Sequence, residues 1–265
     1  MKPFAVAFCL LTLPLAPCTA QGGAAPPASQ GVRAAYARLD AAYDRRDVPG
    51  IMALLAPGFV RRERNAVLTA TQEAAELKDS FDGTVSVRAT SQIQSLRVHG
   101  DGAEAAIARR VEFALPEPMP LLLPPYFAVK VTQEEWHRTQ GQWRMTGMGD
   151  APLPQTLSLL NERDQGIRRR LIADRKNPAL AARMSRIDAA DRARLKQIIR
   201  QYGWPGFDLA GTDGEAAAFI IVQHSDEDRA FQERCLPLIQ AAVRRGQAMP
   251  RDAAYLTDRL RVNAG

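Results

Sequence analysis

After residue 30 the chain carries apolar residues at helical spacing. This pattern predicts a helix that ends at 45–47, a short helix over 51–55 that Pro57-Gly58 stops, and a third helix from about 72 to 81. Thr69 is placed to cap the third helix, with Gln72 three positions later as its partner. The apolar stripe of the first helix consists of Val32, Tyr36, Leu39 and Tyr43.

The following stretch, up to Asp150, alternates apolar and polar positions as strands do. Turn signals stand at Gly100-Asp101-Gly102 and at Gln140-Gly141. The expected strands cover 84–89, 93–98, 103–113, 127–139 and 142–148. Three helices followed by a long antiparallel sheet indicate an α+β unit over residues 31–150.

A two-residue loop at Gln140-Gly141 fixes the register of the last hairpin, because it pairs Thr139 with Gln142. In that register His137 points away from the interior. Val129 and Val131 have the opposite parity to Trp136, which predicts a bulge between them. The face expected to line the core or a cavity carries Trp136, Arg138, Trp143 and Met145.

This element order, with the hairpin of Trp136-His137-Arg138 and Gln142-Trp143-Arg144, resembles the nuclear transport factor 2-like (NTF2-like) or SnoaL-like cone over roughly 30–150. The resemblance implies a curved sheet that wraps a helix around an open-ended apolar cavity. Its relatives include isomerases, dehydratases, hydrolases and proteins that only bind or pair, so the fold does not choose a function. One alternative is a homodimer through the sheet of the cone.

Arg109 shares a strand face with Ile107, Val111 and Phe113, so it points into the cone. It could bind an anionic ligand or form a structural ion pair with Asp44 or Glu134, and the pair is favoured. No residue marks a catalytic carboxylate specifically. The inward candidates for ligand binding are Tyr36, Tyr43, Phe59, Arg109, Trp136, Trp143 and Met145, with Met52 beside them.

From about residue 155 the pattern is helical to the end of the chain. Leu157, Leu160, Asp164, Ile167 and Leu171 share one stripe, and Arg168 stands one turn after Asp164, where it can neutralise the carboxylate. Several residues mark predicted helix ends: Asp188 with Asp191, Thr212 with Glu215, and Ser225 or Asp226 as N-caps, Gly203 and Gly246 as ends, and Pro250 as a first residue. Pro237 is expected to kink its helix.

Three motifs lie in this second unit: Gly203-Trp204-Pro205, then Gln223-His224-Ser225-Asp226 with Gln232, and Ala254-Tyr255-Leu256-Thr257-Asp258-Arg259. They resemble a bacterial helical domain of unknown function over 155–265. The resemblance implies a polar cluster of Asp164, Arg168, Trp204, Gln223, His224, Asp226, Gln232, Tyr255, Asp258 and Arg259, with Gln165 beside it.

His224 lies on an apolar stripe with Ala217, Ile220 and Ile221, which favours a core histidine with a hydrogen-bond partner. The polar cluster is therefore either a site or a core network that gives the fold its specificity. In the resembled family the chain continues to a further glutamine and a Tyr-Gly-Thr-Gln tail, whereas this sequence has Val262-Asn263-Ala264-Gly265 there. If that tail completes a site, the site is incomplete here.

The N-terminus carries the pattern of a secretory signal over residues 1–20: Lys2, an apolar run over 4–16, and small residues before a cut at Gln21. Residues 21–30 are expected to be a flexible leader. The alternative is a lipoprotein anchored at Cys18. An exported, periplasmic or extracellular protein would keep only Cys235, which is expected to be buried and unpaired.

The formal charge of +6 is modest and spread among acidic residues, which argues against a nucleic-acid site. No metal, cofactor or P-loop motif is present, nor a further apolar span after the signal. The apolar loop Leu115–Pro125 is expected to pack on the second unit. The leading hypothesis is a non-enzymatic exported protein that binds a small apolar or anionic molecule, or a partner, through the cone. Alternatives are an isomerase, lyase or hydrolase in the cone, or an activity around His224 and Asp258.

Overall fold

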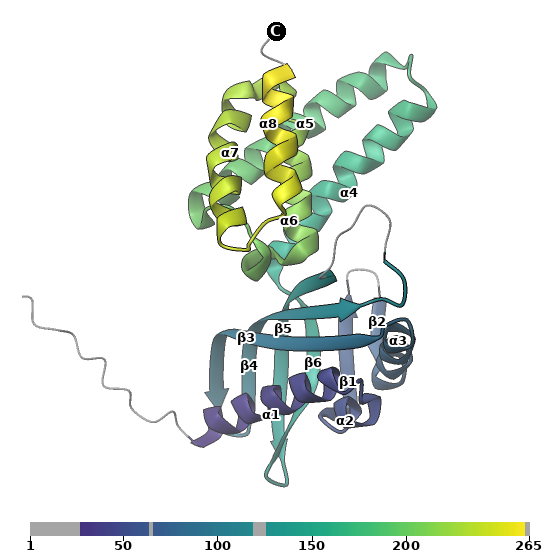
Figure 1. The fold of residues 1–265 in the computed structure, drawn as a ribbon, viewed down its shortest axis with the longest axis vertical. Helices are drawn as coiled ribbons and strands as arrows, with labels where there is room; N and C mark the ends of the chain where they lie inside the picture. Colours follow the sequence, from purple (N-terminus) through teal and green to yellow (C-terminus); the bar gives the residue numbers. More distant parts are fainter. Residues whose placement is uncertain (1–26, 64–65, 119–125, 263–265) are drawn as a thin grey trace, which may run out of the picture.

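A computed structural model describes residues 27–63, 66–118 and 126–262, and it divides into a sheet-containing part and a helical part (Figure 1). The first part holds helices α1 (Pro27–Asp44), α2 (Val48–Met52) and α3 (Ala70–Asp82). Its strands are β1 (Leu55–Glu63), β2 (Ala66–Thr69), β3 (Ser86–His99), β4 (Gly102–Ala114), β5 (Tyr126–Thr139) and β6 (Gln142–Asp150).

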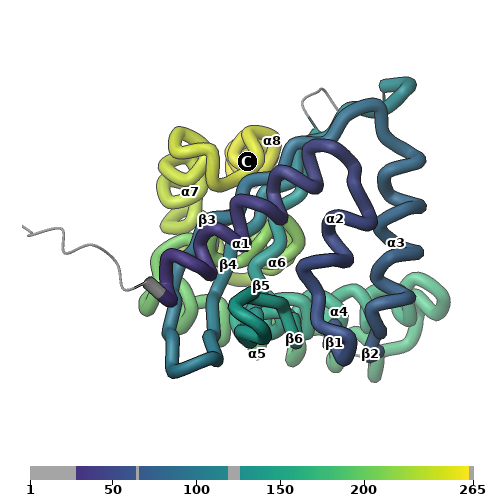
Figure 2. The backbone as a smooth tube through the Cα atoms, turned by 90° about the horizontal axis from the view of Figure 1, so that it is seen from below, coloured from purple at the N-terminus to yellow at the C-terminus, as the bar shows by residue number. Residues whose placement is uncertain are grey.

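The strands form one sheet in the order β2-β1-β6-β5-β4-β3, antiparallel except for the β1–β6 pair. The three helices lie along the sheet, and α1 crosses the strands (Figure 2). They enclose a core with the inner face of β3 to β6, in which the rings of Tyr36 and Trp136 meet edge to face at 4.9 Å. Thr69 and Gln72 form the predicted capping box of α3.

Four sequence-based expectations about this part are wrong. The sheet does not simply follow the three helices and is not wholly antiparallel, because β1 and β2 precede α3 and β1 runs parallel to β6. Pro57-Gly58 does not stop a helix but lies inside β1, where the register with β6 shifts between Leu55 and Val60, so the proline meets no regular ladder position. The two strands expected over 84–98 are one strand, β3, with a register shift between Ile93 and Ser95. Residues 27–30 belong to α1 and not to a leader.

The hairpin register is confirmed, since Thr139 pairs with Gln142 and Trp136 with Met145. A bulge lies in the expected interval, at the step from Glu135 to Trp136, but its extra residue is Thr146 of β6, so it does not change the parity along β5. The opposite parity of Val129 and Val131 has another cause, because both valines face the helical part of the chain.

The described residues after Asp150 form helices only: α4 (Pro152–Ala173), α5 (Pro178–Tyr202), α6 (Phe207–Gln223), the 3-10 turn η1 (Asp226–Asp228), α7 (Arg229–Arg244) and α8 (Pro250–Val262). Gly203 ends α5 with a φ of 75°, and Pro250 opens α8, as predicted. Pro237 lies inside α7. A second buried cluster, around Leu157, Leu195 and Ile239, forms the core of these helices.

The predicted N-caps of the helical part are wrong. Asp188 and Asp191 lie inside α5, whose cap is Asn177, because the helix starts three turns earlier than expected. The cap of α7 is Asp228, which accepts from the backbone of Phe231 at 3.0 Å. The hydroxyl of Thr212 contacts the backbone of Val129 in β5, and Glu215 turns inward to Trp204.

Helix α6 joins the two parts by packing on the outer face of β5. Phe207 lies against Val129 and Val131, and its ring meets that of Phe127 at 5.3 Å. Gly211 breaks the helix with a φ of 72°, and a Cβ there would lie 2.7 Å from the carbonyl oxygen of Val129. Only glycine allows so close an approach of the two backbones.

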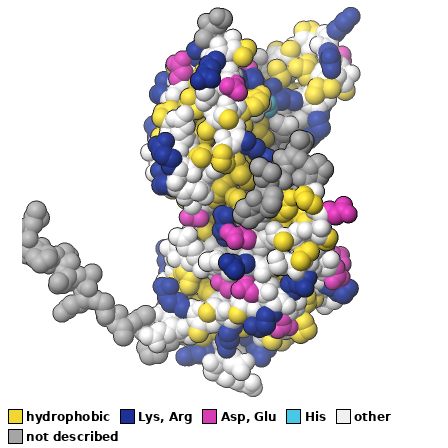
Figure 3. All heavy atoms as spheres, viewed as in Figure 1, with side chains coloured by type: hydrophobic (Ala, Val, Ile, Leu, Met, Phe, Trp, Pro, Cys, Tyr) yellow, Lys and Arg dark blue, Asp and Glu magenta, His cyan; other side chains and the backbone are white. Residues whose placement is uncertain are grey.

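None of the helices in the described ranges combines the length and hydropathy that a membrane crossing requires. Basic and acidic side chains are interspersed on the face drawn in Figure 3. The signal segment lies outside the described residues, as do most of the apolar run in the Leu115–Pro125 loop and the final residues 263–265.

Candidate functional site

A cavity of about 610 Å³ opens in the sheet-containing part, between α3 and the strands β3 to β6. Its apolar lining includes Leu77, Phe81, Val87, Val111 and Phe113. The polar residues that line it include Arg61, Arg62, Glu63, Glu73, Glu76, Asp79, Arg109, Lys130, Thr132 and Asp150. Cationic and anionic side chains thus surround an apolar space.

Arg109 lines the cavity, and the buried Glu134 neutralises its charge. Its guanidinium is 3.2 Å from Oε1 of Glu134, as the favoured ion pair predicts, and its Nε donates to Oγ of Ser91 at 3.0 Å. Glu134 is only 1% exposed and also accepts from Thr132 at 2.9 Å. A buried carboxylate is tolerable when its oxygens are paired in this way.

Tyr36 extends this polar network into α1. Its hydroxyl donates to Oε2 of Glu134 at 2.8 Å and accepts from Nε1 of Trp136 at 2.7 Å. Burial, and then the charge of Glu134, raise the pKa of Tyr36 far above its ordinary value. The tyrosine is therefore neutral and holds Glu134 in place.

Glu73 is the buried carboxyl group at the cavity wall. Burial raises its pKa, although the cationic Arg61, with which it forms an ion pair, acts in the opposite direction. Burial also raises the pKa of Asp150, and that of Tyr43 nearby. Carboxyls whose pKa is raised by burial in a cavity are candidates for a functional role.

The predicted ligand-binding residues are divided among three places. Tyr43 and Arg109 line the large cavity, and Trp143 lines a second cavity of about 310 Å³ together with Arg38 and Arg45. The others are packed in the core and border neither cavity: Tyr36, Phe59, Trp136 and Met145, with Met52 packed against them.

The sequence-based search missed Glu73, Lys130 and Asp150. A signal for Glu73 exists, because Glu73, Leu77 and Phe81 are spaced four apart on one stripe of α3 and are all buried. Lys130 also has a signal, because it has the parity of Trp136 along β5 and so shares the inward face of that strand. No comparable signal marks Asp150.

The helical part brings Asp164, Arg168 and His224 together, as predicted. Asp164 is 2% exposed and lies 2.9 Å from Nδ1 of His224 and 3.0 Å from Nε of Arg168. Arg168 also donates to Asp188 at 2.8 Å, which joins α4 to α5. Burial alone would raise the pKa of Asp164, but the hydrogen bond and charge of His224, followed by Arg168, lower it.

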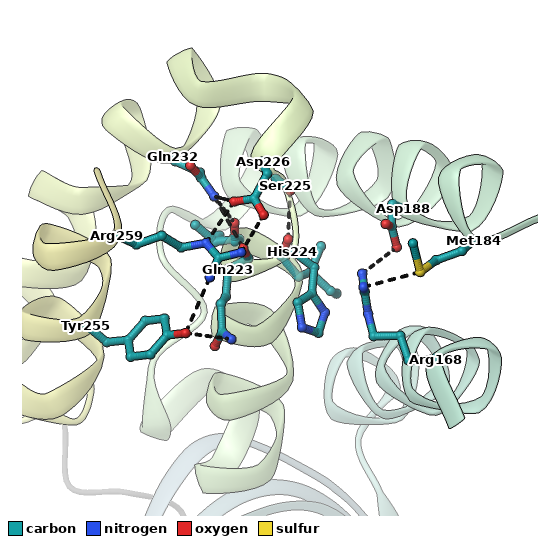
Figure 4. A network of polar contacts seen from close by, with 12 residues as sticks. Arg168, Met184, Asp188, Gln223, His224, Ser225, Asp226, Gln232, Tyr255 and Arg259 are labelled. Carbon is teal, nitrogen blue, oxygen red and sulfur yellow. Dashed lines mark hydrogen bonds and ion pairs between the residues drawn. The ribbon is translucent and has the colours of Figure 1, made fainter. Parts of the chain in front are cut away.

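A neighbouring group surrounds Asp226 (Figure 4). Arg259 forms an ion pair with Asp226 and donates to the hydroxyl of Tyr255 at 3.4 Å, and Gln223 donates to the same hydroxyl at 3.3 Å. Buried Gln232 donates to the backbone carbonyl of Val222 at 3.1 Å and to Asp226 at 3.2 Å. Its hydrogen bonds tie α7 to the end of α6.

Trp204 belongs to a third group in the helical core. Its Nε1 donates to Oε1 of Glu215 at 3.1 Å, while Oε2 of Glu215 finds no donor among the described residues. Burial and the adjacent Asp252 raise the pKa of Glu215 to about 8. A pKa of about 8 means that Glu215 is mostly protonated at neutral pH. Asp258, by contrast, is 75% exposed and belongs to none of the three groups.

Cys235 is buried in the helical core, and burial raises the pKa of its thiol to about 12, which agrees with a structural role. Within the described part of the chain, no three or more His, Cys, Asp or Glu residues are arranged to hold a metal ion.

Comparison with known proteins finds a match between the helical part and a family of unknown function. The profile of a family described as a family of unknown function, DUF6624, matches residues 151–265. No curated protein matches the sequence.

Solved structures match about 46% of this chain. A conserved protein from Planctomyces limnophilus is 11% identical, with 93% of its own chain covered and a TM-score of 0.41. The Kfla4162 protein from Kribbella flavida is 14% identical over 46% of this chain and 88% of its own, with a TM-score of 0.41. An NTF2-like protein from Cytophaga hutchinsonii is 13% identical over 46% of this chain and 94% of its own, with a TM-score of 0.36. Nothing about a ligand or a reaction follows from likeness at this distance.

Proposed function

We propose that the protein is exported and binds a small, largely apolar molecule in the cavity of its sheet-containing part. The observation that carries the proposal is the cavity of about 610 Å³ with an apolar lining and a buried arginine. Cavities of a few hundred Å³ with apolar surface are typical of small-molecule sites, and the charged side chains that surround the apolar space here are largely paired with one another.

The charges around the cavity favour an uncharged molecule with a hydrogen-bond acceptor over a strongly anionic one. Arg109 already has its counterion in Glu134, and Arg61 has Glu73 and Glu76. A carboxylate ligand would have to compete with these ion pairs. A carbonyl or ether oxygen could accept from Arg109 without disturbing the charge balance.

A neutral apolar dye, N-phenyl-1-naphthylamine, tests this proposal through its fluorescence. We expect saturable binding to the unsubstituted protein and its loss in Val87→Trp, since Val87 lines the cavity and the larger ring fills it. The matched control is Val85→Trp. Val85 lies two residues away and its side chain is exposed, so this variant should bind the dye normally. Equal binding by both variants would contradict a cavity site.

Export rests on the residues of the N-terminal segment and has its own test. We expect protein isolated from the extracytoplasmic fraction of its native cells to begin near Gln21 when measured by mass spectrometry. An intact Met1 in the cytosolic fraction would contradict export. An acyl chain on Cys18 would favour the lipoprotein alternative.

The second candidate function is catalysis in the same cavity, as an isomerase, lyase or hydrolase. Glu73 favours it, because a carboxyl with a raised pKa lies at the cavity wall near Tyr43. Glu73→Gln should then abolish turnover of a bound substrate while dye binding persists. Unchanged turnover would exclude Glu73 as the acid or base.

A further inference from the structure

Asp164 holds His224 in one orientation and one tautomer. Asp164 is nearly fully buried and accepts from Nδ1 of His224 at 2.9 Å, from Nε of Arg168 at 3.0 Å and from Nε2 of Gln165 at 2.8 Å. An ionised carboxylate only accepts, so Nδ1 carries the proton. The lone pair of the neutral ring is therefore on Nε2.

Nε2 of His224 is open to a ligand. Both contacts of the ring run from Nδ1 to Asp164, and in the described ranges Nε2 has no partner. It is not among the buried polar atoms that lack partners, and the side chain is 17% exposed, so Nε2 reaches solvent. A histidine needed only for packing would gain nothing from an oriented, accessible lone pair.

The charges near His224 are compensated within the protein. Arg168 on α4 pairs with Asp164 and with Asp188 on α5, and Asp226 in η1 pairs with Arg259. Neither Arg168 nor Arg259, the cations of these pairs, is left over to attract an anionic ligand. The buried carboxylate of Asp164 does, however, stabilise the imidazolium that forms when Nε2 takes up a proton.

A hydrogen-bond donor lies in the group around Asp226, beside the residue that precedes His224. The hydroxyl oxygen of Tyr255 accepts from Gln223 and Arg259, which leaves its own proton for a ligand. Tyr255 is 46% exposed, and Gln223 precedes His224 in α6. Figure 4 shows His224 between this group and the Arg168–Asp188 pair.

We propose that this surface is a second site, in which His224 is a general base for hydrolysis of an uncharged ester and Asp164 is its positioning residue. Nε2 takes a proton from a water molecule, and the water oxygen forms a bond to the carbonyl carbon. When the ester C–O bond breaks, the leaving oxygen takes the proton from Nε2. The ring returns to its starting tautomer, and Asp164 remains ionised throughout.

p-Nitrophenyl acetate is the probe, used with the full mature chain. General-base catalysis contributes on the order of 10²-fold to a rate, so His224→Gln should lower hydrolysis by about that factor. The glutamine amide can still donate to Asp164, which preserves the fold. His137→Gln is the matched control, because His137 is exposed on β5 and should not matter. Equal rates for the unsubstituted protein and His224→Gln would overturn the proposal.

A double-variant cycle distinguishes a positioned histidine from any accessible one. Asp164→Asn should slow hydrolysis in the protein that keeps His224, because an uncharged amide cannot stabilise the imidazolium, and it should have no further effect in His224→Gln. An unchanged rate in Asp164→Asn would exclude Asp164 as a positioning residue.

If Asp164→Asn does not fold, ¹⁵N chemical shifts of the unsubstituted protein decide the point. A protonated Nδ1 and a free Nε2 are expected, and the opposite tautomer would overturn the proposal.

Discussion

Each part of the molecule contains a glutamate that is no more than 1% exposed, and the two parts neutralise it differently. Glu134 in the sheet-containing part is 1% exposed and contacts a cation, Arg109, together with two hydroxyl donors. Glu215 in the helical part is 0% exposed and contacts an indole and a second carboxyl, that of Asp252. One glutamate relies on an ion pair and the other on a proton.

The difference follows from what each core can supply. The curved sheet places Arg109 beside the inner face of β5, so a long cationic side chain reaches Glu134 while its guanidinium still borders the cavity. Around Glu215 the packed helices provide apolar side chains. In such surroundings a protonated carboxyl costs less desolvation free energy than an ionised one. The first part should therefore depend on a residue partner and the second on pH.

The largest expected effect is the loss of the ion pair in Arg109→Met. Removing one partner of a buried pair leaves an uncompensated charge, which costs about 3–5 kcal/mol of unfolding free energy. Urea unfolding monitored by circular dichroism measures the change. The double variant Arg109→Met/Glu134→Leu should regain most of the loss, because no charge remains buried. If the double variant is as unstable as the single one, the cost comes from packing and not from charge.

A smaller effect on the unfolding free energy, one that depends on pH, is expected from Glu215. Its folded pKa of about 8 lies above the ordinary value of 4.5, so between these values the folded state keeps a proton that the unfolded state has lost. Unfolding free energy therefore falls with rising pH across this window, by up to about 1.4 kcal/mol per pH unit. Glu215→Gln should flatten this slope in urea titrations at pH 5, 6, 7 and 8.

The control for this slope is the glutamate of the other part. Glu134→Gln lowers stability by weakening the pair with Arg109, but it should leave the slope between pH 5 and 8 as steep as in the unsubstituted protein. A slope that persists in Glu215→Gln would mean that another group, with Asp252 as the nearest, holds the proton instead.

The sequence predicts the local features of both parts. The two-residue loop sets the hairpin register, Thr69 and Gln72 form their capping box, and Asp164 meets Arg168 because residues four apart share a helix face. The sequence leaves Asp44 and Glu134 open as ion-pair partners of Arg109; the pair forms with Glu134, and Asp44 instead accepts from the backbone of Ala89. Each of these follows from geometry over a few residues or between neighbouring strands.

What the sequence does not predict depends on tertiary contacts. Strand β1 is not predicted, because Pro57-Gly58 is typical of a helix end. The strand forms because its pairing with β6 accommodates the proline at a register shift. Thr212 and Glu215 have the spacing of a capping box, yet the Thr212 side chain contacts β5 and the Glu215 side chain contacts Trp204. The cavity depends on how α3 sits over the curved sheet, and no local pattern encodes that placement.

The smallest expected effect is that of Asp258→Ala. Asp258 stands in the same short motif as Tyr255 and Arg259, but its carboxylate is 75% exposed and lies 3.8 Å from an equally exposed Arg261. Exposed ion pairs of this kind contribute little, so the melting temperature should stay within about 2 °C, as for most surface substitutions. Asp164→Ala is the contrasting variant, since it removes a buried carboxylate with three donors and should lower the melting temperature much further. A large loss in Asp258→Ala would show that this carboxylate has a partner in solution, and the division between buried and exposed carboxyls would no longer explain the helical part.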